Sequence, residues 1–279
     1  MISRILVPTD FSPAANNALR YAVGLARQLD ARLTVLTVYE VPIHVYPIYS
    51  TQTVMLEERV QKQARTEAID RQLIELEAEF LAHQAVPYEL ARQIGPIEET
   101  LENVATHGGY DLVVMGAEGA TGLAALLGST TTHLMRRVSV PVLAVPAQAR
   151  YQGINRMLLA ADYQEDIELE AYRPLVRLAQ ACQAHVDVLY VLGKYEWLSE
   201  AEVEAGRDLK QLLQAVPHTF RIERYSDVET GILTHLQAHP ADLLAMMPQQ
   251  HTLFERLLER SHTTHLCFRT HVPLLTFRA

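Results

Sequence analysis

Short apolar runs alternate with segments of helical periodicity along most of this 279-residue chain. The run Ile5–Pro8 has the composition of a buried strand, and apolar residues then recur at helical spacing over residues 19–29. Asp10 or Ser12 can cap this helix, and Pro13 suits its first turn. Because the alternation continues through the chain, we predict an α/β fold with a mostly parallel sheet and helices on both faces.

The other predicted elements follow the same order in each half. The first half has predicted strands at 5–8, 32–39, 88–92, 112–115 and 141–145, with later helices at 56–80, 98–106 and 129–138. The second half has predicted strands at 157–160, 186–192, 219–224, 243–246 and 274–277, with helices at 167–184, 200–215, 229–238 and 261–269. We expect the apolar rows of helix 56–80 to pack in a core or a dimer contact. The Pro- and Tyr-rich segment 41–50 is expected to be a lid, a partner surface or a plain covering loop.

The two halves are copies of one repeat. Residues 115–145 match residues 247–277 without a gap at a shift of 132, and eleven positions are identical. The openings RILVPTDF at Arg4 and RMLLAADY at Arg156 match at a shift of 152, so the second copy is 20 residues shorter in its middle. A polar stretch at 146–153 separates the copies. We therefore predict two domains, at 1–147 and 153–279.

The copies differ most in their glycines. The first copy has glycines at Gly116, Gly119, Gly122 and Gly128. The gap-free alignment sets larger residues against them: Pro248, His251, Phe254 and Arg260. Glycine permits a close approach to the backbone, so the first copy is expected to have a contact that the second lacks.

Candidate binding residues follow two strands of the first half. Pro8-Thr9-Asp10 ends the first strand and Met115-Gly116 ends the fourth, and ligands of doubly wound sheets bind at such carboxyl ends. Gly128-Ser129-Thr130 then begins a helix, where free N–H groups and the helix dipole favour an anion such as phosphate. The alternative is a glycine-rich turn with a serine cap.

The opening ILVPTDFS, the turn at Gly95-Pro96 and the closing VVMG…GS…VPVLAV resemble the universal stress protein family in its tandem form. The resemblance covers essentially the whole chain and is more specific in the first half. It implies two doubly wound, mostly parallel, five-stranded Rossmann-like domains of the adenine nucleotide alpha hydrolase type. These would form an intrachain pseudo-dimer through strands 141–145 and 273–277, with a further homodimer as an open alternative.

The ATP-binding branch of that family carries the motif G-x2-G-x9-G-[ST]. This chain has the same order of glycines, but only eight residues separate Gly119 from Gly128. The resemblance implies nucleotide-binding roles for these residues: Pro8, Thr9, Asp10, Val38, Met115, Gly116, Gly119, Gly128, Ser129 and Thr130.

Charge in the glycine segment argues for weak binding. Residues 116–130 contain no Lys or Arg, and Glu118 adds a negative charge beside the expected phosphates. Mg²⁺ would be needed to offset that charge for a triphosphate. We therefore expect ATP or another adenine nucleotide to bind loosely, with AMP or ADP favoured.

The second half is expected to bind no nucleotide in this way. Ala160 and Ala161 replace Pro8 and Thr9, although Asp162 is retained. Its bulky glycine replacements would fill the cradle, and Pro248 would lack an N–H donor. We expect this half to pair with the first half or to present a different surface.

Composition excludes several other classes. A formal charge of −9 argues against a nucleic-acid partner, and no apolar run is long enough to span a membrane. Two cysteines and a start without a signal peptide predict a cytoplasmic protein with free thiols. His262, His265 and Cys267 have no standard zinc-site spacing, so we expect no metal site there.

No nucleophile or general base accompanies the expected phosphate site, so the chain is predicted to be a stress-response sensor or regulator and not an enzyme. A slow, incidental hydrolysis of ATP would be compatible with this prediction of a sensor or regulator. The alternative is an interaction module that binds no nucleotide. An adenylating or nucleotidyl-transferring enzyme is disfavoured, because its usual phosphate motifs (SGGxDS-like or HxGH-like) are missing from the sequence.

Overall fold

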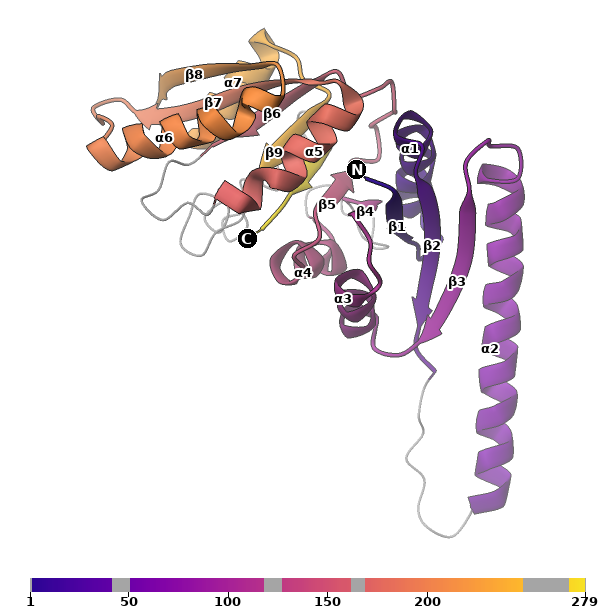
Figure 1. Ribbon diagram of the computed structural model, residues 1–279. Helices are drawn as coiled ribbons and strands as arrows, with labels where there is room; N and C mark the ends of the chain where they lie inside the picture. Colours follow the sequence, from indigo (N-terminus) through magenta and orange to yellow (C-terminus); the bar gives the residue numbers. More distant parts are fainter. Residues whose placement is uncertain (1, 42–50, 118–126, 162–168, 248–270, 279) are drawn as a thin grey trace.

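The computed structural model describes residues 2–41, 51–117, 127–161, 169–247 and 271–278, with side chains from residue 59 onward in the second of these segments. These residues form one ten-stranded sheet with the strand order β3-β2-β1-β4-β5-β10-β9-β6-β7-β8. Helices lie on both faces of the sheet, and the two halves of the chain occupy its two ends (Figure 1). The predicted α/β fold with a mostly parallel sheet is confirmed.

The elements follow one another in the predicted order. The strands are β1 Arg4–Pro8, β2 Arg32–Tyr39, β3 Tyr88–Ile94, β4 Leu112–Gly116, β5 Val142–Val145, β6 Arg156–Ala160, β7 His185–Gly193, β8 His218–Tyr225, β9 Leu243–Met246 and β10 Leu274–Thr276. The helices are α1 Pro13–Leu29, α2 Thr51–Phe80, α3 Ile97–His107, α4 Ser129–Arg137, α5 Arg173–Cys182, α6 Glu200–Leu212 and α7 Val228–Ala238, with short 3₁₀ turns η1 Leu169–Tyr172 and η2 Leu213–Ala215.

The central strands are buried on both faces, which explains their nearly continuous apolar sequences. Successive residues of β1 alternate between two cores: Ile5 and Val7 face the core that includes α1, α2, α5 and α6. Leu6 faces the opposite core, which includes α3, α4 and α7. The sheet therefore forms the middle layer of a three-layer α/β/α structure.

The last strands of the two halves join them into one sheet. β5 and β10 pair antiparallel, with Leu143 opposite Leu275 and Ala144 opposite Leu274. Each of these strands also pairs in parallel with a strand of its own half, β4 and β9 respectively. The expected intrachain pairing of segments 141–145 and 273–277 is thus observed.

Strand register shows where the repeat copies differ in length. Paired residues of the second and third strands are 55 positions apart in the first half, at Leu33 and Tyr88. The equivalent pair in the second half, Val186 and His218, is only 32 apart. The shortening therefore falls between these strands, where the 30-residue α2 is replaced by the 13-residue α6.

Two predicted helices differ from the structure. The helix predicted from residue 167 begins as α-helix only at Arg173, after the 3₁₀ turn η1, because Pro174 is tolerated only in the first turn. In α2, Ile69, Leu73, Leu76 and Phe80 are buried as predicted. Val60, which was predicted in the same apolar row, is 59% exposed.

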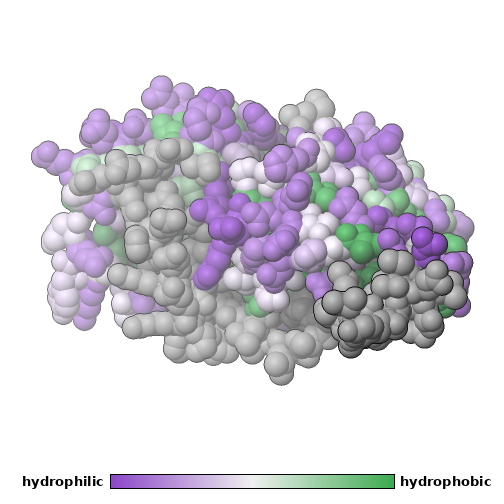
Figure 2. All heavy atoms as spheres, turned by 90° about the horizontal axis from the view of Figure 1, so that it is seen from below, coloured by the Kyte–Doolittle hydropathy of each residue, from purple (hydrophilic) through white to green (hydrophobic). Residues whose placement is uncertain are grey.

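The described residues on one face of the molecule are mainly hydrophilic (Figure 2). In the face shown in Figure 2, hydrophobic side chains are scattered among hydrophilic ones. Among the described residues, no helix is long and apolar enough to cross a membrane. Segment 41–50 (apart from Val41) and the predicted helix 261–269 lie outside the described residues.

Candidate functional site

A cavity of about 360 Å³ opens at the carboxyl edge of the first half's strands. Nine of the ten residues predicted for nucleotide binding line it: Pro8, Thr9, Asp10, Val38, Met115, Gly116, Gly128, Ser129 and Thr130. Gly119, the tenth, lies outside the described residues, as does Glu118. Residues far apart in sequence thus converge at one edge of the sheet, as doubly wound topology requires.

The turn after β1 is built from local hydrogen bonds. The Thr9 hydroxyl accepts a hydrogen bond from the Phe11 N–H at 3.0 Å, and Asp10 Oδ1 accepts one from the Ser12 N–H at 3.0 Å. Phe11 has a left-handed backbone with φ of 63°, which is unfavourable for a non-glycine residue. Ser12 then caps α1 by accepting a hydrogen bond from the Ala15 N–H at 3.2 Å. Asp10 is held at the cavity rim and Ser12 is the cap.

One wall of the cavity is apolar, with Leu36, Leu101 and Met115 buried beneath it. The sequence prediction missed six lining residues: Ser12, Ala15, Leu36, Ile97, Leu101 and Thr131. Two signals could have found the apolar ones. Leu36 lies two residues before Val38 on the same face of β2, while Ile97 and Leu101 share one face of α3. This wall suits the apolar faces of a planar ring.

The opposite wall contains the N-terminus of α4. Gly128 occupies the N-cap position, and no described side chain accepts a hydrogen bond from the first turn. The serine-cap part of the alternative is therefore wrong, because Ser129 is already the first helical residue. Free N–H groups and the positive end of the helix dipole face the cavity, which favours an anionic group there.

Gly116 is required by packing as well as by the cavity. A Cβ atom at this position would lie 3.0 Å from the backbone carbon of Ala14 in the first turn of α1. The Gly116 carbonyl accepts a hydrogen bond of 2.9 Å from the buried hydroxyl of Thr131. Close approach of a helix therefore explains this glycine without any ligand, and Thr131 ties α4 to the end of β4.

The cavity has little charge of its own. Among the described lining residues Asp10 is the only charged side chain, and none is Lys, Arg or His. His133 lies on α4 outside the lining and contacts α3: its Nε2 is 2.8 Å from Glu102 and its Nδ1 is 3.5 Å from Glu98. Arg137 also contacts Glu102, at 3.7 Å. These basic groups hold α3 to α4 and do not supply a cation to the cavity.

The pairing register of the strands corrects the gap-free sequence alignment of the two copies at Gly116. Strand pairing makes Met246 equivalent to Met115, so Gly116 corresponds to Met247 and not to Pro248. The connection to the last strand is one residue longer in the second half, because Leu244 pairs with Leu274 where Val113 pairs with Val142. A side chain still stands where the first half has glycine. Asp162, Pro248, His251, Phe254 and Arg260 lie outside the described residues.

Groups of three or more potential metal ligands do not occur among the described residues. His262, His265 and Cys267 fall outside them. Cys182 is a free, buried thiol, and burial raises its pKa to about 12. That thiol is therefore protonated and unreactive at neutral pH.

The fold and cavity define a tandem doubly wound α/β protein with a ligand-sized cavity at the carboxyl edge of its first half. The chain matches the Universal stress protein family over residues 1–146 and 153–278. It therefore belongs to the universal stress protein family. Membership of this family supports a role for the protein in the stress response.

Individual relatives agree with this assignment. The chain is 24% identical to universal stress protein Slr1230 of Synechocystis sp. over 302 residues, which covers 99% of this chain and all of the relative. The structure of a universal stress protein from Archaeoglobus fulgidus has a TM-score of 0.67 at 14% identity. The match covers 100% of this chain and 99% of the Archaeoglobus chain. The structure of a putative universal stress protein from Pseudomonas aeruginosa has a TM-score of 0.58 at 17% identity. The match covers 99% of this chain and 93% of the Pseudomonas chain. At these identities the solved structures show a shared fold.

Proposed function

We propose that the first half of this protein binds an adenine nucleotide in the carboxyl-edge cavity. The chain would act in the cytoplasm as a sensor or regulator and not as an enzyme. The observation that carries the proposal is the convergence of nine motif residues around one cavity, beside an α4 N-terminus that lacks a described side-chain cap. Family membership supports it, because the motif residues lie in the half that most resembles nucleotide-binding members.

The walls suit the two ends of a nucleotide. Leu36, Val38 and Leu101 provide apolar surface for a base. Ser129 and Thr130 provide hydroxyl and N–H donors at the positive end of a helix for a phosphate. The volume of about 360 Å³ lies in the range of small-molecule sites.

Charge decides which nucleotide binds best. Asp10 gives the described lining a negative charge, and no described cationic side chain lines the cavity to offset the charge of a phosphate. Each added phosphate therefore increases repulsion, so AMP should bind better than metal-free ATP. Mg²⁺ would reduce the difference, because it neutralises part of the triphosphate charge.

A catalytic role has less support. Three described hydroxyls lie at the phosphate end, those of Ser129, Thr130 and Thr131. The Thr131 hydroxyl donates to the Gly116 carbonyl, and no described His or carboxylate forms a hydrogen bond with Ser129 or Thr130. The only described carboxylate in the lining, Asp10, already accepts a hydrogen bond from the Ser12 backbone. Without a base to activate water or a hydroxyl, any hydrolysis would be slow.

Titration calorimetry with AMP, ADP and ATP, with and without Mg²⁺, tests the proposal. We expect AMP to bind in either condition and ATP to gain affinity when Mg²⁺ is added. Mass spectrometry of the denatured protein would also identify any nucleotide retained through purification. Absence of binding by all three nucleotides, together with no retained nucleotide, would favour the interaction-module alternative.

A charge variant locates the binding. Ser129→Glu places a carboxylate at the first helical position of α4, where it stabilises the helix by about 0.3–1 kcal/mol. The same carboxylate repels phosphate, so nucleotide affinity should fall while thermal stability is kept. Ser129→Gln is the matched control, because it has the same size without the charge. Equal affinities for the two variants would place the nucleotide elsewhere.

A further inference from the structure

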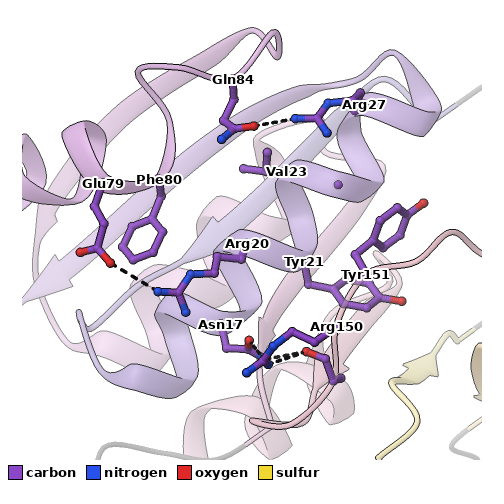
Figure 3. A pocket seen from close by; sticks show the side chains of 12 residues that line it. Asn17, Arg20, Tyr21, Val23, Arg27, Glu79, Phe80, Gln84, Arg150 and Tyr151 are labelled. Carbon is purple, nitrogen blue, oxygen red and sulfur yellow. Dashed lines mark hydrogen bonds and ion pairs between the residues drawn. The ribbon is translucent and has the colours of Figure 1, made fainter.

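A second cavity, of about 420 Å³, lies on the other face of the first half (Figure 3). Its floor is the outer surface of α1, one wall is the end of α2, and the other wall is the connection between the two halves. The carboxyl-edge cavity lies beside α3 and α4, whereas α1 and α2 cover the opposite face of the sheet. The two cavities are therefore separate sites.

Three guanidinium groups surround this cavity, from Arg20, Arg27 and Arg150. Among the described lining residues the only carboxylate is Glu79, which is 3.3 Å from Arg20. The partners of the other two arginines are neutral. Arg27 donates to Gln84 Oε1 at 2.5 Å, and Arg150 donates to Asn17 Oδ1 at 2.7 Å. The lining thus has an excess of positive charge in a protein whose formal charge is −9.

Aromatic rings form part of the surface between the guanidinium groups. Phe80 is buried beneath Arg20, whose guanidinium carbon lies 4.6 Å from the ring centroid. Tyr21 and Tyr151 form an edge-to-face pair at the other side, with ring centroids 5.0 Å apart. Figure 3 shows these rings and the arginines lining the same space. The cavity therefore combines apolar surface with cationic donors.

We propose that this cavity binds a small phosphate monoester with an aromatic or similarly apolar body. Guanidinium groups match phosphate geometry through paired N–H donors, and a weakly hydrated guanidinium loses less on binding than an ammonium group. Two of the three arginines have no described carboxylate partner, so their charge is available to attract an anionic ligand. The partly exposed ring of Tyr151 contacts the apolar body of the ligand.

The position of the site gives it a structural consequence. Arg20 and Arg27 belong to α1, whereas Arg150 belongs to the connection between the halves. Asn17 already holds that connection to α1 through hydrogen bonds to the carbonyls of Pro146 and Ala149, at 2.9 and 3.1 Å. A ligand that contacts both sides would add to this attachment and stabilise the folded chain.

Calorimetry with the full chain and phenyl phosphate tests the site, with benzyl alcohol as an uncharged probe and inorganic phosphate as a probe without the ring. We expect phenyl phosphate to bind more tightly than phosphate, and benzyl alcohol not to bind. Arg20→Gln and Arg27→Gln should each weaken phenyl phosphate binding about tenfold, which is the usual effect of losing one charge-assisted hydrogen bond.

Two further variants make the test specific. Glu79→Gln removes the only carboxylate among the described lining residues and should strengthen binding, the opposite effect to the arginine variants. Arg71→Gln on the exposed surface of α2 removes one positive charge outside the cavity and should leave binding unchanged. Equal effects of Arg27→Gln and Arg71→Gln, or no gain from Glu79→Gln, would overturn the proposal. So would binding that is blocked by Ser129→Glu and not by Arg27→Gln, because the ligand would then be in the other cavity.

Discussion

Replacing Gly24 by alanine should destabilise the protein, although glycine is a poor residue in the middle of a helix. Gly24 lies within α1, and the ring of Tyr151 packs directly on it. A Cβ atom there would lie 2.4 Å from Cδ1, 2.7 Å from Cγ and 3.0 Å from Cβ of Tyr151. The ring cannot simply turn away, because it also packs edge-to-face on Tyr21 and its hydroxyl donates to Gln28.

Two effects of opposite sign set the magnitude. Helix propensity favours alanine over glycine by about 1 kcal/mol. Overpacking in a well-filled contact costs about 1–3 kcal/mol, and three contacts this short put Gly24→Ala in the upper part of that range. The expected net loss is about 1–2 kcal/mol in the free energy of unfolding.

A double-mutant cycle separates the two effects. In a Tyr151→Ala background the ring is gone, so Gly24→Ala should stabilise the protein by up to about 1 kcal/mol. Urea unfolding followed by far-UV circular dichroism measures all four proteins. Gly206→Ala within α6 is the control for helix propensity alone and should stabilise by about 1 kcal/mol. If Gly24→Ala stabilised both backgrounds equally, the packing argument would be refuted.

Three other substitutions test separate parts of the fold. Asn17→Ala should lower the free energy of unfolding by about 2–3 kcal/mol, because two carbonyls of the connection lose a buried donor; urea unfolding that stayed unchanged would contradict this. Phe277→Ala should cost about 3–5 kcal/mol, since this ring is 1% exposed and packs on Tyr172, and near-UV circular dichroism should lose signal. Asp227→Ala removes the N-cap of α7 and should cost about 1 kcal/mol at pH 7. The Thr230 backbone N–H lowers the pKa of Asp227, so this cost should be present above the unfolded-state pKa and disappear as pH falls through the lowered folded-state value; a pH-independent difference would exclude capping by the carboxylate.

Most strands and helices could be predicted from the sequence, because each pattern reflects local geometry and burial. β2 was predicted with its observed bounds at Arg32–Tyr39, since an apolar strand buried on both faces differs clearly from its polar flanks. The helix around α5 was predicted too long at its start. Apolar spacing continues into the preceding segment, and Pro174 marks the first turn only once the backbone is known.

The candidate site could be predicted only in part from the sequence. Residues carried by a motif, such as Asp10 and Ser129, could be named in advance. The lining from α3 could not, because Ile97 and Leu101 have ordinary helical spacing and reach the cavity only through the packing of α3 on the sheet. The role of Gly116 also needed coordinates, since a close helix and a close ligand both require the absence of a side chain.

By itself the sequence determined the α/β class, the duplication and the motif residues of the first cavity. All three depend on residue type and spacing along the chain. Only the tertiary structure decided that the copies are offset by one residue at Gly116 and that Gly128 rather than Ser129 occupies the cap position. It also showed that Arg150 meets the surface of α1 in a second cavity. The offset and the second cavity depend on contacts between segments that are distant in the sequence, and no local pattern encodes them.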